Sequence, residues 1–175
     1  MDTKYSIADL RYLMARLRDP QTGCPWDIKQ TYQTITPHTI EEVYEVVDAI
    51  ERGDIAHLSE ELGDLLFQII FYSQLGEEDN QFDFDAVVFG ITAKLLRRHP
   101  HVFPDGTLQS VRDSQTVATE AEIKSHWERI KKQERSAAGS SGTLDDIPLA
   151  LPALSRAFKL QKRAATRGFD WPHIS

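Results

Sequence analysis

Residues 60–72 read EELGDLLFQIIFY, and this stretch decides the fold class of the chain. At 100° per residue, its apolar side chains from Leu62 onward surround almost the whole of a helix, so we expect this helix to be largely buried. One narrow polar stripe remains, formed by Glu61, Asp64 and Gln68. Because buried carboxylates are costly unless a cation compensates them, the stripe predicts a bound cation.

A second acidic stretch, EEVYEVVD, precedes it at residues 41–48. Residues three or four apart lie side by side on a helix, so Glu42 pairs with Glu45, and Glu61 pairs with Asp64. Four clustered carboxylates that face inward are the hard oxygen ligands typical of Mg²⁺, with Mn²⁺ as a substitute. We therefore predict one metal site formed by the two pairs.

Acidic runs on helices are more commonly solvated faces, and this alternative fits part of the first stretch. Its apolar side centres opposite Glu41 and Asp48, which we expect in solvent, whereas Glu42 lies at the edge of that side with Glu45 next to it. For the second pair the solvated alternative is weaker, because little of its helix can face water. We favour metal binding there.

The composition is that of a globular protein with one domain and a real core: 175 residues, 41% hydrophobic and 27% charged. The single cysteine, Cys24, excludes an internal disulfide and gives no zinc-type spacing. No stretch approaches a membrane span and no signal-peptide core begins the chain, so we expect a cytoplasmic protein without membrane contact. The net charge of −7 argues against nucleic acid as a partner, because such binding depends on Lys and Arg meeting phosphates.

Nearly every segment between turns has a helical pattern, and alternating strand patterns are absent, which predicts an all-α bundle. Thr36 and Pro37 form a cap followed by proline, so we expect the first acidic helix to begin there. A flexible linker is predicted by composition at residues 136–142, and a frayed end at 168–175. The predicted helices follow Ser6 as far as Asp19 and then cover residues 36–53, 54–75, 84–98, 114–135 and 147–167.

A basic cluster lies further along the chain, where Lys94, Arg97 and Arg98 share one helix face at i, i+3 and i+4. Alone, such a cluster is commonly a solvated helix end that the helix dipole favours. Beside a metal site it acquires a function, because arginine makes bidentate contacts with phosphate and lysine supplies a point charge. An acidic metal site and a basic face together suit a polyphosphate substrate bridged by Mg²⁺.

Aromatic residues and histidines give weaker indications. Trp26 and Trp127 can each stack on a nucleobase, and each can equally be a core anchor, the interpretation preferred for Trp26. We interpret His38 and His57 as surface residues or helix-cap partners, not as catalysts. The chain contains neither a Gly-rich phosphate loop nor a nucleophile elbow, which excludes a P-loop mechanism and leaves covalent catalysis without a nucleophile.

Five motifs follow one another along the chain: GCPWDIKQT (23–31), EEVYEVVDAI (41–50), EELGDLLFQIIFYSQ (60–74), KLLRRHPHVF (94–103) and W-x-x-I-K-x-Q-E (127–134). Together they resemble the MazG family of nucleoside triphosphate pyrophosphohydrolases, in order and at the expected intervals. Residues 1–135 are thus expected to form a MazG-like domain. Beyond the linker, residues 143–175 resemble the connection between the two halves of longer, tandem members, so the chain resembles a first half.

The resemblance implies an all-α bundle of four to five helices that works as a homodimer or higher oligomer. It implies Mg²⁺-dependent hydrolysis of NTPs or dNTPs to the monophosphate and pyrophosphate. The family's metal motif falls on Glu42, Glu45, Glu61 and Asp64, its basic substrate-binding segment on Lys94, Arg97 and Arg98, and its late tryptophan on Trp127.

For the reaction we expect water to attack the α-phosphorus in line, with Mg²⁺ stabilising the leaving pyrophosphate. A carboxylate not fully committed to metal, Glu41 or Glu45, is the candidate to orient or deprotonate that water. The rival from another class is a catalytically silent half that acts as a dimerisation or regulatory module. The sequence counts against this rival, because an idle site would be free to lose its buried acids.

Overall fold

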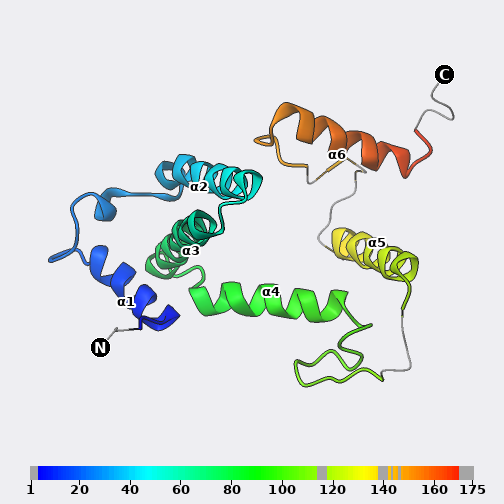
Figure 1. Cartoon of the computed structure of the whole chain (residues 1–175), viewed down its shortest axis with the longest axis horizontal. Helices are drawn as coiled ribbons and strands as arrows, with labels where there is room; N and C mark the ends of the chain where they lie inside the picture. The colour runs from blue at the N-terminus through cyan, green and yellow to red at the C-terminus, as the bar shows by residue number, and fades with distance from the viewer. Residues whose placement is uncertain (1–3, 114–117, 138–141, 143, 146, 170–175) are drawn as a thin grey trace. The chain divides into compact units, whose positions relative to one another are not determined.

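Every regular element that the structure, a computed structural model, describes is a helix, which confirms the all-α prediction (Figure 1). The described residues are 4–113, 118–137, 142, 144, 145 and 147–169. The elements are α1 (Ile7–Leu17), the short 3-10 helix η1 (Asp27–Lys29), α2 (Tyr32–Arg52), α3 (Ile55–Glu78), α4 (Phe84–Arg98), α5 (Glu120–Ala137) and α6 (Ala153–Ala165). The chain divides into two compact units, Met1–Lys94 and Leu95–Ser175, and the boundary falls within α4.

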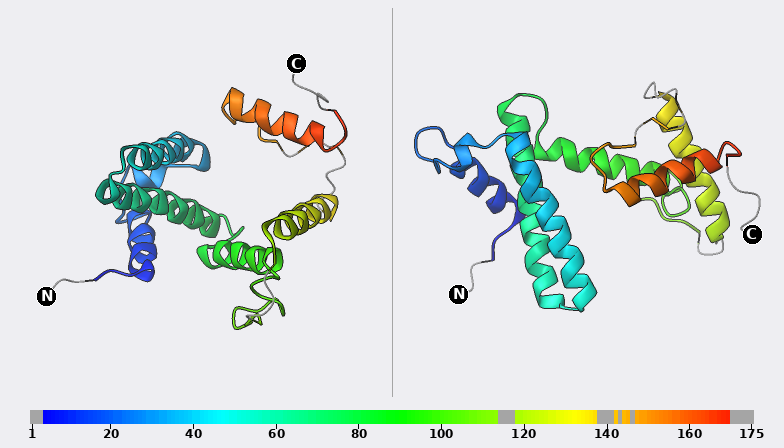
Figure 2. Two further views of the ribbon diagram at one scale, coloured as in Figure 1. Left: turned by 45° about the vertical axis from the view of Figure 1, so that its right-hand side comes forward. Right: turned by 90° about the horizontal axis from the view of Figure 1, so that it is seen from above.

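In the first unit, the two acidic stretches form an antiparallel helical hairpin of α2 and α3, which lie side by side in every view (Figures 1 and 2). The turn between them is short. Gly53 ends α2 with a φ of 69°, a left-handed conformation that glycine adopts without a steric penalty. Asp54 then begins α3 by accepting a hydrogen bond from the backbone N–H of His57 at 3.1 Å. This turn brings the two acidic stretches together.

Helix α2 begins at Tyr32, so the predicted start at Thr36 and Pro37 was wrong. A capping box upstream starts the helix instead: the Thr31 hydroxyl accepts from the N–H of Thr34 at 3.3 Å, and the Thr34 hydroxyl accepts from the N–H of Thr31 at 2.8 Å. Pro37 therefore lies inside the second turn of the helix, where its ring removes one backbone hydrogen bond.

The core of the first unit is formed where α1, α2 and the second half of α3 meet. Its buried apolar residues are Met14, Ile35, Ile70, Phe71 and Leu75. Arg18 closes one end of this core, because its guanidinium lies 5.2 Å from the centre of the Phe71 ring and binds Glu78 at 2.6 Å.

The predicted burial of α3 is confirmed mainly for its second half, between Gln68 and Gly76, whereas Glu61 is the one buried residue of its first half. In the first half, Leu62 and Asp64 are exposed, because α1 contributes its core residue Met14 only to the cluster around Ile70 and Phe71. The helix also continues to Glu78, beyond the predicted end at Leu75.

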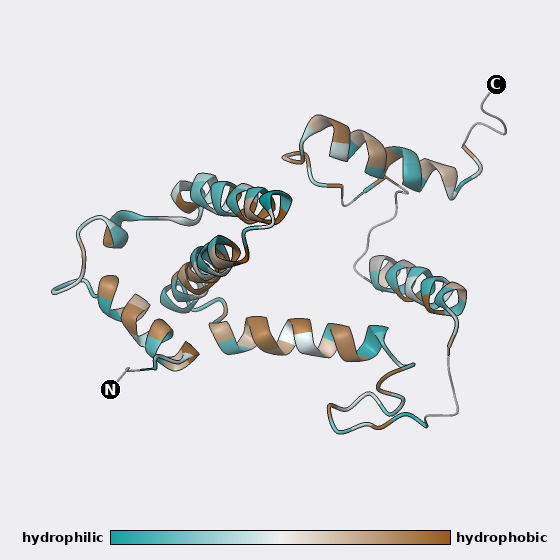
Figure 3. Ribbon diagram, viewed as in Figure 1, coloured by the Kyte–Doolittle hydropathy of each residue, from teal (hydrophilic) through white to brown (hydrophobic). Residues whose placement is uncertain are grey.

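Helix α4 has the predicted bounds, and two later helices are shorter than predicted. Helix α6 begins after Pro152 and not at Ile147, because two prolines interrupt the segment before it. Residues 114–117 at the predicted start of α5, most of the predicted linker and the end of the tail lie outside the described residues. In the hydropathy colouring of Figure 3, α5 is mainly hydrophilic, α4 is mainly hydrophobic up to its hydrophilic last turn, and α6 is mixed. Among the described residues, none of the helices combines the length and apolar character that a membrane crossing requires.

Candidate metal and substrate site

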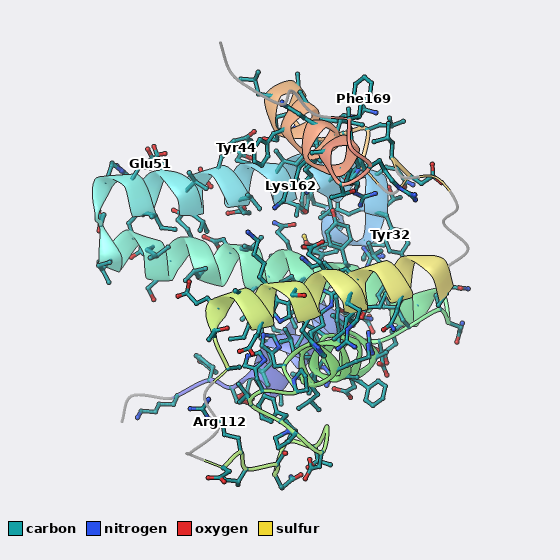
Figure 4. The ribbon with its side chains drawn as sticks, turned by 90° about the vertical axis from the view of Figure 1, so that its right-hand side faces the viewer. Tyr32, Tyr44, Glu51, Arg112, Lys162 and Phe169 are labelled. Atoms are coloured by element: carbon teal, nitrogen blue, oxygen red, sulfur yellow. The ribbon has the colours of Figure 1, made fainter. Side chains whose placement is uncertain are left out.

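Three carboxylates meet where α2 faces α3. Glu42 and Glu45 come from α2 and Glu61 comes from α3, and one oxygen of each lies within 4.8 Å of the other two. On the opposite side of α2, Tyr44 and Glu51 point away from α3 (Figure 4). One face of α2 thus brings Glu42 and Glu45 toward α3, while the opposite face points to solvent, as the helical periodicity predicts.

The register of the two helices is fixed by contacts on one side of this cluster. The hydroxyls of Thr39 on α2 and Tyr72 on α3 are hydrogen-bonded at 2.9 Å, and the rings of Tyr72 and Tyr32 are stacked with centroids 6.3 Å apart. Glu61 lies on the polar stripe of α3 that also contains Gln68, and it is 7% exposed. Packing therefore holds this carboxylate inside the hairpin, where water cannot fully solvate it.

Electrostatics in the cluster favour the binding of a cation. Burial raises the pKa of Glu42 above its ordinary value, and the negative charges of Asp64, Glu45, Glu61 and Glu41 raise it further. Among the described residues, no lysine or arginine forms an ion pair with the three clustered carboxylates. In addition, the Oε1 atom of Gln68, on the polar stripe of α3, is buried and has no hydrogen-bond partner among the described residues. A hard divalent cation would relieve this repulsion, so the donor set fits Mg²⁺.

Asp64 differs from the prediction, because its side chain is exposed and the three-carboxylate cluster does not include it. Its charge nevertheless contributes to the raised pKa of Glu42. The prediction of a buried Asp64 was wrong, because the buried core of this unit lies around Ile70, Phe71 and Leu75, further along α3. Glu41 and Asp48 are solvated as predicted, and Asp48 pairs with Arg52 at 2.9 Å.

A histidine that sequence reasoning set aside lies against the cluster. Nε2 of His57 is 3.1 Å from Oε1 of Glu61, and Nδ1 is 3.6 Å from Oε2 of Glu60. The spacing of one helical turn between His57 and Glu61 was the available signal. A neutral imidazole that donates Nε2–H to Glu61 would fix the carboxylate and leave its second oxygen for a metal.

The basic face lies on the last turns of α4. Lys94 is exposed, and the two arginines that follow it are both bound by Glu134 on α5. Oε1 of Glu134 accepts from Arg97 Nε at 3.0 Å and Nη2 at 2.5 Å, while Oε2 accepts from Arg98 Nη2. Hydrogen bonds from the two arginines lower the pKa of Glu134 to about 2. Glu134 is the last residue of the motif W-x-x-I-K-x-Q-E, which was the available signal, but sequence reasoning gave it no role.

Trp127 also binds this end of α4. Its indole N–H donates to the carbonyl of Arg98 at 2.7 Å, and its ring is edge-on to His99 with centroids 5.2 Å apart.

In the first unit, Trp26 is 52% exposed, so its preferred interpretation as a core anchor was wrong. The neighbouring Asp27 is buried instead, with its carbonyl bound by Arg18.

Residues 30–103 match the family model described as the MazG nucleotide pyrophosphohydrolase domain. This part of the chain is a MazG domain. The resemblance inferred from the motifs is thereby confirmed. The matched MazG segment contains all four predicted metal ligands and the basic face, whereas Trp127 and Glu134 lie beyond it.

Two MazG relatives and one solved structure define the similarity further. A protein of Escherichia coli K12 named nucleoside triphosphate pyrophosphohydrolase is 51% identical over 165 residues, covering 94% of this chain and 59% of that protein. The nucleoside triphosphate pyrophosphohydrolase/pyrophosphatase MazG of Thermotoga maritima is 39% identical, covering 93% and 58%. This chain thus spans about three-fifths of the length of both. The crystal structure of a MazG-related protein from Thermotoga maritima shares the fold, with a TM-score of 0.57 at 24% identity over 72% of this chain and 99% of that one.

Proposed function

We propose that this MazG chain hydrolyses ribo- and deoxyribonucleoside triphosphates to the monophosphate and pyrophosphate, with Mg²⁺ as the cofactor. The observation that carries the proposal is the cluster of Glu42, Glu45 and Glu61, whose charges no lysine or arginine pairs within the described residues. The names of the two relatives support the reaction, since both are called nucleoside triphosphate pyrophosphohydrolases.

Glu42, Glu45 and Glu61 would hold the metal, with Asp64 as the fourth carboxylate at the exposed edge. When bound, Mg²⁺ neutralises charge on phosphate oxygens and lowers the pKa of a coordinated water, and Mn²⁺ would substitute. Glu61 is the most firmly fixed ligand, because it is buried and His57 contacts one of its oxygens. Glu45 is exposed and can rotate toward substrate more freely.

The attacking water requires an acceptor, for which we propose Glu45 or Glu41. Glu45 offers an oxygen beside the other two ligands, so it is close to any water that the metal holds. Glu41 is exposed one residue before Glu42, and its Oε2 is 3.8 Å from Nδ1 of His38. A carboxylate free of metal would accept the proton more readily than one that coordinates it.

Lys94, Arg97 and Arg98 would bind the β- and γ-phosphates, so that charge developing on the leaving pyrophosphate meets fixed cations. Trp127 would contribute to substrate binding through its ring, because its N–H is already bound to the Arg98 carbonyl. A base stacked on an indole requires no particular hydrogen-bonding pattern, which suits a broad set of nucleotides.

The test is to incubate the purified chain with a panel of NTPs and dNTPs plus Mg²⁺ and to resolve the products. We expect monophosphate and pyrophosphate in equal amounts, and no turnover after chelation. A methylene bridge between the α- and β-phosphates should block cleavage, whereas a β,γ-methylene bridge should not. If diphosphate and orthophosphate form first, the proposed cleavage position is wrong.

The alternative is a silent MazG half that serves as a dimerisation or regulatory module. One observation favours it: Glu134 already occupies both arginines of the basic face. This alternative predicts that nucleotide binds weakly or not at all and that no member of the panel is hydrolysed. Turnover that depends on Glu61 would exclude it.

A further inference from the structure

We propose that Glu134 is a positioning residue that brings Arg97 and Arg98 together into a single phosphate-binding pair. The inference rests on the proposed function, because it concerns how the basic face binds phosphate. It deepens that function by adding a residue that lies beyond the matched MazG segment.

The first argument is geometric. Consecutive residues on a helix diverge by about 100°, so the side chains of Arg97 and Arg98 should point in different directions. Like charges also separate them further. Glu134 offsets both effects, because each of its two oxygens accepts from one of the arginines. One carboxylate thereby gathers two guanidinium groups at one place.

The second argument concerns how firmly Glu134 itself is held. Helix α5 is attached to the end of α4 at two points, Trp127 and Glu134, which are seven residues apart and so lie on the same side of α5. The side chains of Glu134 and Arg98 are only 25% and 23% exposed. Arg97 is 55% exposed, so packing and the Trp127 hydrogen bond hold Glu134 and Arg98, and Glu134 in turn holds the more exposed Arg97.

The third argument is that the pair keeps the capacity to bind an anion. Two guanidinium groups and one carboxylate leave a net charge of +1, and Lys94 lies one turn earlier on the same helix. Arg97 uses its Nε and Nη2 for Glu134, so Nη1 remains for a ligand within the described contacts. Ordering both side chains before substrate arrives reduces the entropy lost on binding.

The experiment measures binding of inorganic pyrophosphate to the full chain by calorimetry, together with KM and kcat for a hydrolysed triphosphate. In Glu134→Gln we expect pyrophosphate affinity to fall by about tenfold and KM to rise in parallel, with kcat changing much less. Glu134→Asp keeps the charge and should restore part of the affinity. The matched control is Glu128→Gln on the same helix, an exposed residue paired with Lys131, which should leave both quantities unchanged.

A double-mutant cycle shows whether Glu134 acts through the arginines. In the background Arg97→Ala plus Arg98→Ala, adding Glu134→Gln should change pyrophosphate affinity no further. If Glu134→Gln does not fold, the same cycle is run with Glu134→Asp. The proposal then requires that Glu134→Asp binds pyrophosphate more weakly than the unmodified chain.

Unchanged or tighter pyrophosphate binding in Glu134→Gln would overturn the proposal, because Glu134 would then be idle or a competitor for the arginines. Absence of pyrophosphate binding by the unmodified chain would overturn it too. The proposed activity can fail separately: a chain that binds pyrophosphate through Glu134 but hydrolyses no triphosphate supports this inference and contradicts that activity.

Discussion

Glu61 is the residue at which the metal proposal can be tested most directly, because its carboxylate is buried and repelled by its neighbours. We expect Glu61→Gln to reduce Mg²⁺-dependent turnover by about a hundredfold or more, since a charged ligand is lost. Circular dichroism should show unchanged helix content, and the metal-free protein should become slightly more stable. The control is Asp48→Asn, which removes an exposed carboxylate paired with Arg52. Equal turnover in the Glu61 variant and the unmodified chain would refute the metal site.

Arg98 is the test of the basic face. Removing one charge-assisted contact with phosphate should weaken triphosphate binding by about tenfold to a hundredfold in Arg98→Ala. Monophosphate binding should weaken less, because the proposed contacts are with the β- and γ-phosphates. Calorimetry with both nucleotides measures the difference. Equal losses for the two ligands would indicate a structural role at the end of α4.

Glu134 makes a prediction about pH. Its pKa is lowered from 4.5 to about 2 in the folded protein, so its ion pairs contribute stability above pH 4.5 that is lost as the pH falls toward 2. The unmodified chain should therefore be more stable than Glu134→Gln near neutral pH, and the gap should close between about pH 4.5 and 2. Urea unfolding at several pH values measures it. A gap that is constant over this range would show that the carboxylate charge contributes nothing.

At the scale of the elements, sequence patterns predicted most helix bounds because their signals are local. Helix α4 runs from Phe84 to Arg98 as predicted, since Pro100 prevents its continuation. The start of α2 was missed because the reciprocal bonds of Thr31 and Thr34 outweigh a later proline. The motif at residues 127–134 contains Glu134 but does not reveal its partners, because Arg97 and Arg98 are 37 and 36 residues away and only packing brings them together.

The same limit applies to the candidate site. The i, i+3 spacing put Glu42 and Glu45 on one face of α2, and the short turn after α2 brings that face to Glu61. It could not predict that Asp64 is exposed, since that depends on which part of α3 the neighbouring helix α1 covers.

The α2–α3 turn gives a prediction for stability. Gly53 has a φ of 69°, and a Cβ atom there would meet nothing within 4 Å, so only the backbone conformation opposes a side chain. We expect Gly53→Ala to lower the free energy of unfolding by about 1 kcal/mol. Gly90 is the control, because it lies inside α4 with equally open surroundings, and Gly90→Ala should stabilise by about 0.5–1 kcal/mol. Urea denaturation of both variants measures the free energy of unfolding. An increase in Gly53→Ala would contradict the prediction.

At the scale of the whole molecule, α2 and α3 expose several large apolar side chains. They include Ile40, Val43, Val47, Leu62 and Ile69. Contiguous apolar surface of this kind is uncommon on monomers, and two copies packing through a two-fold axis would cover it. We therefore predict a homodimer or higher oligomer. Light scattering at micromolar concentration should give at least twice the chain mass of 19.9 kDa, and a stable active monomer would exclude this assembly.

The short turn at Gly53 and Asp54 also determines which changes in chain length a domain of this kind can tolerate. One residue added inside α2 or α3 rotates everything beyond it by about 100°, which would move Glu42 or Glu61 off the face they share. One residue added at the turn leaves both helical faces as they are. Insertions and deletions between these two glutamates should therefore be confined, across related sequences, to the turn itself, while the segment between α4 and α5 is free to vary in length.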